Sequence, residues 1–322
     1  MPLEITGLSK RYGNKWILRD VEFTAAEGRV LGLLGGTASG KSTLLRILAG
    51  ATSDSGGSAL LDGGDLLKLR QKERGVTSLP EAATAPLIGI LASRSRESSG
   101  ETVLKQFEER MTKAGKLILL DDPFAQLDGE LRRDAVAMVR RAAKARDRIV
   151  IFATADFEQL TEVADDVAVL AQDRIIQTGT PQDVYEEPSS VAAAVLTGGG
   201  NLFEARRLSK SNAELPEFHT IDGGHRIYGA PTQKSRLGSI HANVTLCIRP
   251  EQVMMSMGAS FPEDNLLRGV VTGIQFRGAT SLVEFDAAGL KLQTRIFKVV
   301  GLEVGQEFML GLPPHRIVVL KD

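Results

Sequence analysis

The sequence predicts an α/β domain built on a buried parallel sheet, followed by a smaller all-β domain. Three short, almost continuous apolar runs, at residues 29–34, 116–120 and 149–153, are typical of strands buried on both faces of a parallel sheet. Segments with helical apolar spacing alternate with these runs, which is the order of an α/β fold. Beyond residue 200 the pattern changes to β-type segments separated by turn residues, which indicates a small β-barrel.

The helical segments lie between the apolar runs and before the change of pattern. Residues 42–49 and 131–148 carry apolar side chains at helical spacing. We interpret the basic residues around the apolar stripe of residues 131–148 as a solvated face rather than a phosphate-binding surface. A third helical stretch, 189–196, leads into the triplet Gly198 to Gly200, which has the composition of a linker. The expected barrel strands are 244–248, 267–275, 281–285, 291–297 and 317–320.

Length and composition limit the class of function. At roughly 150 residues per domain, 322 residues predict about two domains, which we place at 1–198 and 199–322. Lysine and arginine number 39 and aspartate and glutamate 40, so the net charge of −1 gives no bulk attraction for nucleic acid. The single cysteine, Cys247, cannot form an intramolecular disulfide, and no apolar run approaches the roughly 18 residues of a membrane span. We expect a reduced, cytosolic chain with no nucleic-acid partner.

The histidines exclude one kind of chemistry from the first domain. All four lie beyond residue 200, at His219, His225, His241 and His315. Chemistry in the first two hundred residues therefore cannot use an imidazole as base, switch or ligand. Scattered histidines and one cysteine do not predict a zinc site.

A glycine-rich phosphate-binding motif follows the first buried run. It has the pattern G-x-x-x-x-G-K-S/T and stands between an apolar strand and an amphipathic helix, which makes the match specific. The glycines let backbone N–H groups surround a β-phosphate, the lysine bridges β- and γ-oxygens, and the hydroxyl reaches Mg²⁺. The alternative is a glycine-rich turn that binds nothing. The predicted nucleotide-binding residues are Gly35, Gly36, Thr37, Ala38, Ser39, Gly40, Lys41, Ser42 and Thr43.

A second motif supplies the acidic group that such a site needs. The buried run from Lys116 to Leu120 ends in Asp121, and in P-loop proteins a carboxylate at the end of a neighbouring strand holds Mg²⁺. Many core strands end in a carboxylate, so this segment indicates a metal site only in combination with the glycine-rich loop. Ser42 and Asp121 are therefore predicted Mg²⁺ ligands. Together the two motifs predict binding of a nucleoside triphosphate with Mg²⁺.

Three longer phrases stand at residues 121–128, 179–188 and 248–251. They resemble the ATP-binding subunits of ABC transporters, and within them the sugar and polyol importers whose ATPase carries a C-terminal TOBE domain. The run from Asp121 to Asp128 resembles the Walker B segment and the D-loop, with Asp128 as the D-loop aspartate. Residues 179–188 (GTPQDVYEEP) resemble the tail of the importer ATPase domain, and residues 248–251 (IRPE) resemble a phrase of the regulatory β-domain. Tyr12 matches the aromatic residue that stacks on adenine in this family.

This resemblance implies an ABC-type P-loop ATPase domain and an OB-like TOBE barrel, with ATP and Mg²⁺ as ligands. It implies partners: membrane-spanning transporter subunits, a solute-binding protein, and a second ATPase subunit in a homodimer or a heterodimer with a paralogue. It also implies a cytoplasmic protein, peripheral on the inner face of the cell membrane, that serves the import of a carbohydrate or polyol. The barrel is expected to provide subunit contacts and regulation.

Two residues depart from the family at the predicted catalytic centre. Where the family has a catalytic glutamate, this chain has Asp122, whose carboxylate is retracted by about 1.5 Å because one methylene is missing. A misplacement of about 1 Å can cost roughly a hundredfold in rate. The family's switch histidine is replaced by Ala155, which removes a contact to the γ-phosphate. Asp122 is the candidate catalytic residue that remains.

The signature motif, which closes over the nucleotide of the partner subunit in this family, is degenerate. The family's spacing places it at Glu97 to Glu101, with Ser98, Ser99 and Gly100 at its centre, and only Ser98 and Gly100 match. Glu97 and Glu101 stand at its two ends, and their charge opposes a γ-phosphate. We expect closure to be weakened.

The Q-loop and the helical subdomain also differ from the family pattern. Glu81 stands where a glutamine usually contacts Mg²⁺, so it is a third candidate ligand, as an anion. The interval from Lys41 to Asp121 is short for the family, which implies a shortened helical subdomain. The surface that receives a membrane subunit is therefore altered.

Two functional hypotheses remain. The first is a working ATPase subunit of an importer, in which Asp122 orients the attacking water. The second is a hydrolysis-deficient, regulatory or structural nucleotide-binding subunit, because Ala155 and the signature motif are altered. An unrelated P-loop kinase or GTPase leaves the Walker B run and the importer-type tail unexplained.

Overall fold

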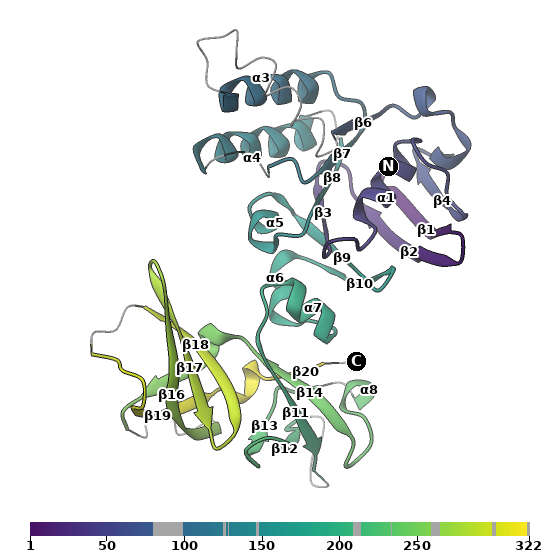
Figure 1. Ribbon diagram of the computed structural model, residues 1–322. Helices are drawn as coiled ribbons and strands as arrows, with labels where there is room; N and C mark the ends of the chain where they lie inside the picture. The colour runs from purple at the N-terminus through teal and green to yellow at the C-terminus, as the bar shows by residue number, and fades with distance from the viewer. Residues whose placement is uncertain are drawn as a thin grey trace. The chain divides into compact units, whose positions relative to one another are not determined.

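The computed structural model describes residues 1–79, 99–124, 127, 129–145, 148–208, 214–232, 234–258, 265–297 and 301–320. Its contacts divide the chain into unit 1, Met1–Val184, and unit 2, Tyr185–Asp322 (Figure 1). The division falls before the glycine triplet at 198–200, because helix α7 (Val191–Leu196) packs through Ala194 against Cys247 and Leu320 of unit 2.

Unit 1 contains the predicted parallel sheet. Six strands lie in the order β10-β9-β3-β8-β7-β6, and all neighbours are parallel except β10, which is antiparallel to β9 at one edge. The three apolar runs form the adjacent strands β3, β8 and β7, whose buried side chains confirm the prediction. The strand bounds are β3 Val30–Leu34, β6 Val76–Leu79, β7 Leu117–Asp121, β8 Ile149–Thr154, β9 Asp166–Ala171 and β10 Arg174–Gly179.

Helices cover this sheet. Helix α4 turns Ala135, Val139 and Ala142 toward the core and leaves its arginines at the surface, as the apolar stripe predicts. It ends at Lys144, earlier than the stripe suggests. Arg148 lies beyond the helix, where it is buried and donates to the carbonyl of Met111 at 2.9 Å. The bounds are α1 Lys41–Leu48, α3 Ser99–Thr112, α4 Gly129–Lys144, α5 Phe157–Val163 and α6 Pro181–Glu186, with short 3₁₀ turns η1 at Leu66–Lys68 and η2 at Gln71–Glu73.

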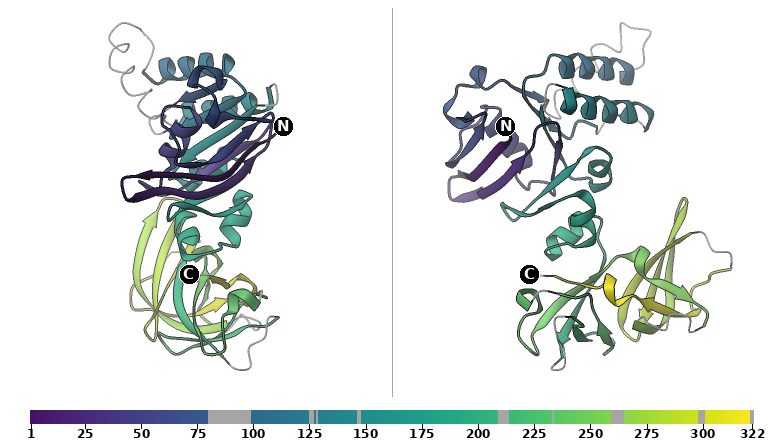
Figure 2. Two further views of the ribbon diagram at one scale, coloured as in Figure 1. Left: turned by 90° about the vertical axis from the view of Figure 1, so that its right-hand side faces the viewer. Right: turned by 180° about the vertical axis from the view of Figure 1, so that it is seen from behind.

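Unit 1 also contains an antiparallel sheet that the sequence reading missed. Its strands lie in the order β2-β1-β4-β5, and β1 and β2 form the long hairpin seen edge-on in Figure 2. Helix α1 and the buried faces of both sheets share one core. The strands are β1 Leu3–Tyr12, β2 Lys15–Ala25, β4 Gly56–Leu61 and β5 Gly64–Asp65.

Unit 2 is the predicted small all-β domain. It consists of two five-stranded antiparallel sheets, ordered β13-β12-β11-β14-β20 and β15-β19-β16-β17-β18, which enclose a common apolar core as in an OB-like barrel. All five predicted strands are present, and β11, β12, β13, β15 and β19 are additional. The bounds are β11 Asn201–Arg207, β12 Glu217–Thr220, β13 Arg226–Tyr228, β14 Asn243–Ile248, β15 Met254–Ser256, β16 Asn265–Arg277, β17 Thr280–Ala287, β18 Leu290–Phe297, β19 Glu307–Leu312 and β20 Val318–Leu320, with α8 at Lys234–Leu237, η5 at Pro250–Gln252 and η6 at Pro314–Arg316.

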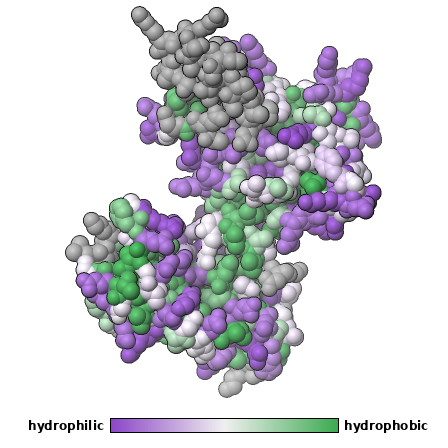
Figure 3. Space-filling view, viewed as in Figure 1, coloured by the Kyte–Doolittle hydropathy of each residue, from purple (hydrophilic) through white to green (hydrophobic). Residues whose placement is uncertain are grey.

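The surface of unit 2 carries some exposed apolar side chains. Figure 3 shows hydrophobic residues among hydrophilic ones over the β16–β18 sheet, where Phe276 and Phe297 are exposed near the strand ends. Among the described residues, no helix is long and apolar enough to cross a membrane.

Candidate functional site

The glycine-rich loop lies at the carboxyl end of the central strand of the parallel sheet. Strand β3 ends at Leu34, which pairs with Thr154 of β8 on one side and Val169 of β9 on the other. The N–H of Gly35 then donates to the carbonyl of Thr154 at 3.2 Å, and helix α1 begins at Lys41. Ligands of parallel α/β sheets bind at this edge, beyond the carboxyl ends of the strands.

Two glycines of the loop are required by close packing. A Cβ atom on Gly35 would lie 2.5 Å from Ser39 Oγ and 2.7 Å from a backbone carbonyl oxygen of β9. Gly40 has φ +106°, and a Cβ there would lie 2.8 Å from the side chain of Leu18. The loop therefore fits closely between β9 and β2. Ala38 also adopts a left-handed conformation, with φ 61°, which strains the turn before the helix.

Lys41 is folded back onto its own loop. Its ammonium group donates to the carbonyl oxygens of Gly35 at 2.6 Å and Gly36 at 2.9 Å. Partial burial lowers the pKa of Lys41, and the negative charges of Asp121 and Asp122 act in the opposite direction. The lysine thus lies within electrostatic reach of both carboxylates, as the two motifs predict. A phosphate group would replace the two carbonyl oxygens with stronger, charged acceptors.

The two aspartates follow the strand next to β8. Asp121 is the last residue of β7 and pairs with Ala153 of β8. The N–H of Asp122 donates to the carbonyl of Ala153 at 2.8 Å. Asp122 has φ 46°, a left-handed backbone conformation directly after the end of β7. Burial raises the pKa of Asp122, with a smaller increase from Asp121, while Thr154 and Lys41 lower it. Asp122 is thus a half-buried carboxylate within electrostatic reach of Lys41.

Thr154 is a site residue that the sequence reading missed. Its hydroxyl donates to the Asp122 carboxylate at 3.4 Å and accepts from the N–H of Asp156 at 3.1 Å. Asp156 in turn caps helix α5. Ala155 lies between them, exposed just past β8, and its methyl group offers no hydrogen bond. A hydroxyl at the end of a buried strand beside an acidic loop was the available signal.

Tyr12 lies on the β1–β2 hairpin. It pairs with Lys15 at the end of β1, and its side chain is 53% exposed. The ammonium group of Lys10 lies 4.7 Å from the ring centroid and donates to the carbonyl of Ser53 at 2.6 Å. The same hairpin reaches the phosphate loop, since β2 packs on Gly40. One ring face is thus supported by a fixed cation and much of the ring is open to a base.

The remaining predicted site residues lie in helices α1 and α3 or outside the described residues. Glu81, Ser98 and Asp128 lie outside the described residues, as does Glu97. Ser99 and Gly100 form the beginning of helix α3, which extends to Thr112. Ser42 and Thr43 are half-buried in the first turn of α1, next to Lys41.

The residues present fit a triphosphate and Mg²⁺. The hydroxyl of Ser39 is buried inside the loop without a hydrogen-bond partner among the described residues, so the loop holds a polar group that its own backbone does not satisfy. In the part of the chain described, no group of three or more His, Cys, Asp and Glu could hold a metal ion alone. Mg²⁺ usually takes one or two protein ligands together with phosphate oxygens and waters. Ser42 and Asp121 match that requirement.

Comparison with known proteins identifies the families that the two parts of the chain match. Residues 18–215 match the family described as ABC transporter, and residues 246–320 match the family described as TOBE domain. An iron(III) import ATP-binding protein of Escherichia coli (strain K12) is 25% identical, covering 99% of this chain and 98% of its own. A spermidine/putrescine import ATP-binding protein of Clostridioides difficile (strain 630) is 26% identical over 99% and 97% of the two chains. A sulfate/thiosulfate import ATP-binding protein of Bacillus cereus (strain ATCC 14579) is 30% identical over 67% and 72%.

Proposed function

The chain belongs to the ABC transporter family, and on that premise we propose that it is the ATP-binding subunit of an importer. The observation that carries the proposal is the position of Lys41, on a glycine-rich loop after β3 and within electrostatic reach of Asp121 and Asp122 after β7. The full-length match to import ATP-binding proteins and the TOBE region support it. We further propose that it works at the cytoplasmic face of the membrane with membrane-spanning subunits, a solute-binding protein and a second ATPase subunit.

The proposed roles follow from the chemistry of the side chains. Lys41 and the loop N–H groups bind the β- and γ-phosphates, and Tyr12 stacks on the base. Ser42 and Asp121 hold Mg²⁺, which neutralises charge on the phosphate oxygens when bound. Asp122 orients the attacking water, held in place by Thr154. Glu81 and Asp128 keep their proposed roles as a metal ligand and the D-loop aspartate.

The class of transported solute is a separate question. The tail motifs predicted a carbohydrate or polyol, whereas the three relatives named above import iron(III), spermidine or putrescine, and sulfate or thiosulfate. None of these solutes is a carbohydrate, so the proposal is an importer subunit without a carbohydrate assignment.

A second candidate function is nucleotide binding without useful hydrolysis. It is favoured by the short carboxylate of Asp122 and by Ala155, which leaves no side-chain donor for a γ-phosphate just past β8. In this case the subunit holds a closed interface or a partner rather than driving transport.

ATP binding and turnover distinguish these functions. The full chain is purified, and its affinity for Mg·ATP is measured by calorimetry. Phosphate release is measured for the chain alone and with its proposed membrane-spanning subunits. Turnover at about 1 per second or more supports the ATPase subunit and contradicts the second candidate. Binding without turnover in either state supports the second candidate, and absence of binding contradicts both.

A further inference from the structure

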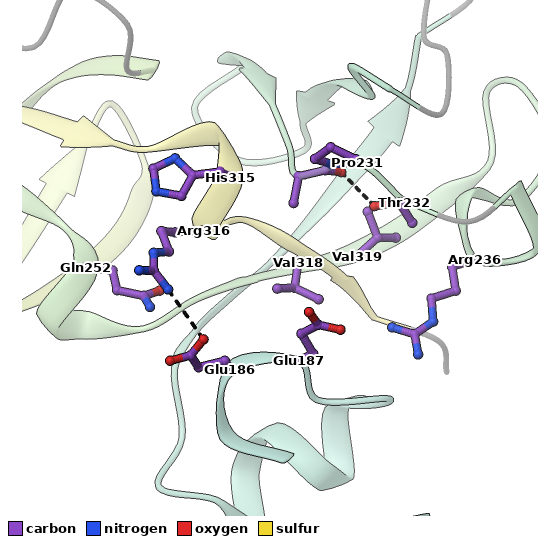
Figure 4. Close-up of a pocket in the computed structure, with 11 residues that line it drawn as sticks. Glu186, Glu187, Pro231, Thr232, Arg236, Gln252, His315, Arg316, Val318 and Val319 are labelled. Carbon is purple, nitrogen blue, oxygen red and sulfur yellow. Dashed lines mark hydrogen bonds and ion pairs between the residues drawn. The ribbon is translucent and has the colours of Figure 1, made fainter. Parts of the chain in front are cut away.

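Unit 2 contains a cavity of about 290 Å³ whose wall pairs some of its own polar groups (Figure 4). Glu186 and Arg316 form an ion pair of 3.7 Å, and the hydroxyl of Thr232 donates to the carbonyl of Ala230 at 2.7 Å. These contacts hold the wall together and do not indicate a ligand. The buried lysine of the β1–β2 hairpin is a different case, because its charge faces a residue of the proposed nucleotide site.

Lys10 is a buried cation that covers one face of the Tyr12 ring. It is only 7% exposed, whereas Tyr12, two positions further along β1, is 53% exposed. Residues two apart on a strand lie on the same side of the sheet. The ammonium group of Lys10 lies 4.7 Å from the centroid of the ring, within the range of a cation–π interaction. The exposed part of the ring is left for a ligand.

The charge of Lys10 has neutral partners. Its ammonium group donates to the carbonyl oxygen of Ser53 at 2.6 Å, and its other partner is the Tyr12 ring. Within the described ranges of the chain, Lys10 forms no ion pair with a carboxylate. Because the charge is not neutralised and burial limits screening by water, its field acts on the ring more strongly than that of a paired surface lysine.

The same lysine fixes the ring relative to the phosphate loop. Ser53 lies in the loop that follows helix α1, the helix that begins at Lys41. Two further hydrogen bonds join that loop to β1: the N–H of Ser55 donates to the carbonyl of Ser9 at 2.7 Å, and the N–H of Arg11 donates to the hydroxyl of Ser55 at 3.2 Å. The ring and the phosphate-binding lysine are therefore held on connected elements, which lowers the entropic cost of binding both ends of one nucleotide.

A cation on one face of an aromatic ring changes what the other face stacks on. The faces of aromatic rings carry negative charge, so two rings in a direct face-to-face sandwich repel each other. The ammonium group draws this charge toward itself and weakens the repulsion. The open face therefore gains most from a base with a large, electron-rich π surface. Purines, with two fused rings, present more of that surface than pyrimidines do.

We propose that Lys10 is a positioning residue that gives the nucleotide site a preference for purine bases. It acts through Tyr12: it holds the ring in place and polarises it, so that adenine or guanine stacks more tightly than cytosine or uracil. This role rests on the proposed function, in which the nucleotide binds at the phosphate loop with its base on Tyr12.

Calorimetry on the full chain compares ATP, GTP, CTP and UTP, each with Mg²⁺. These nucleotides share the triphosphate, so differences between their affinities report the base. We expect both purine nucleotides to bind at least about fivefold more tightly than both pyrimidine nucleotides. Lys10→Met removes the charge but keeps an unbranched side chain, so it lowers purine affinity by about fivefold and pyrimidine affinity by less than about twofold. Lys10→Arg keeps a cation and retains the purine preference.

Three further variants separate the base effect from general effects. Lys15→Met is the matched control: Lys15 is exposed and pairs with Tyr12 across the hairpin, so its loss removes the same charge nearby and changes all four affinities equally. Tyr12→Leu removes the ring, and in that background Lys10→Met no longer alters the ratio of ATP to CTP affinity. Thermal unfolding checks each fold. If Lys10→Met unfolds, Lys10→Gln, whose amide can still donate to Ser53, makes the same comparison.

The two possible failures are distinguishable. If none of the four nucleotides binds the parent chain, the proposed function fails, and the role of Lys10 fails with it. If the four bind equally well, if loss of the Lys10 charge weakens all four by the same factor, or if the effect persists without the Tyr12 ring, only the role of Lys10 is overturned.

Discussion

The guanidinium carbon of Arg249 lies 4.1 Å from the centroid of the Tyr185 ring. The two residues are 64 positions apart and belong to the two sequence phrases, at 179–188 and 248–251, that carry the importer-type resemblance. Arg249 also donates to Thr197 Oγ1 at 2.8 Å and to the carbonyls of Ala194 and Gly199, while the Tyr185 hydroxyl donates to Glu251 at 2.5 Å. The two phrases therefore form one structural element that attaches α7 and the glycine linker to β14.

Replacing Arg249 by methionine tests this element. The carbonyls of Tyr185, Ala194 and Gly199 lose a buried donor, so we expect the free energy of unfolding to fall by about 2 kcal/mol or more. Urea unfolding of the full chain, followed by circular dichroism, measures it. The matched control is Arg268→Met, because Arg268 is 73% exposed and its ion pair with Glu307 is 3.8 Å long. A loss as small as that of the control contradicts the assigned role.

Tyr185→Phe separates the hydroxyl from the ring. Burial and the bond to Glu251 raise the pKa of Tyr185 to about 12, so its neutral form is favoured in the folded chain. Its contribution to stability is complete below the ordinary tyrosine pKa of about 10 and is lost as pH rises toward that folded value. We expect parental stability to decrease across this alkaline window more steeply than that of Tyr185→Phe, measured by urea midpoints. Parallel curves for the two proteins would refute this.

Lys41→Ala removes the cation of the phosphate loop. The loop's carbonyls keep their place but the phosphates lose a charged donor, so Mg·ATP binding by calorimetry becomes undetectable. Lys68→Ala is the control, because Lys68 is 83% exposed and its ion pair with Asp65 is 3.6 Å long. Unchanged affinity in Lys41→Ala would rule out this loop as the nucleotide site.

Two substitutions at Asp122 test its role in turnover. Asp122→Asn keeps the size but removes the charge, so ATP binding persists and phosphate release is lost. Asp122→Glu adds one methylene, which extends the carboxylate by about 1.5 Å. If Asp122 is too short for its proposed role, turnover rises by up to roughly a hundredfold. Phosphate release and calorimetry on the same preparations separate the two effects. Retained turnover in Asp122→Asn would show that another group orients the water.

Local patterns explain which strands were predictable. Strands β3, β7 and β8 are buried on both faces, so their apolar runs are visible without any knowledge of neighbours. Strand β1 was missed because its alternation is interrupted: Gly7 has φ +61°, and the pairing with β2 shifts register between Ile5 and Leu8. The period of two on which strand prediction depends is broken there.

The phosphate loop was determined by the sequence alone, because its chemistry lies in consecutive residues whose backbone conformation is local. The same holds for the acidic end of β7 and for the change to β-type segments beyond residue 200. Which distant residues meet was decided only by the tertiary structure: Thr154 with Asp122, and Arg249 with Tyr185. These pairs depend on strand order and packing, and no spacing along the chain specifies which loops reach the same place.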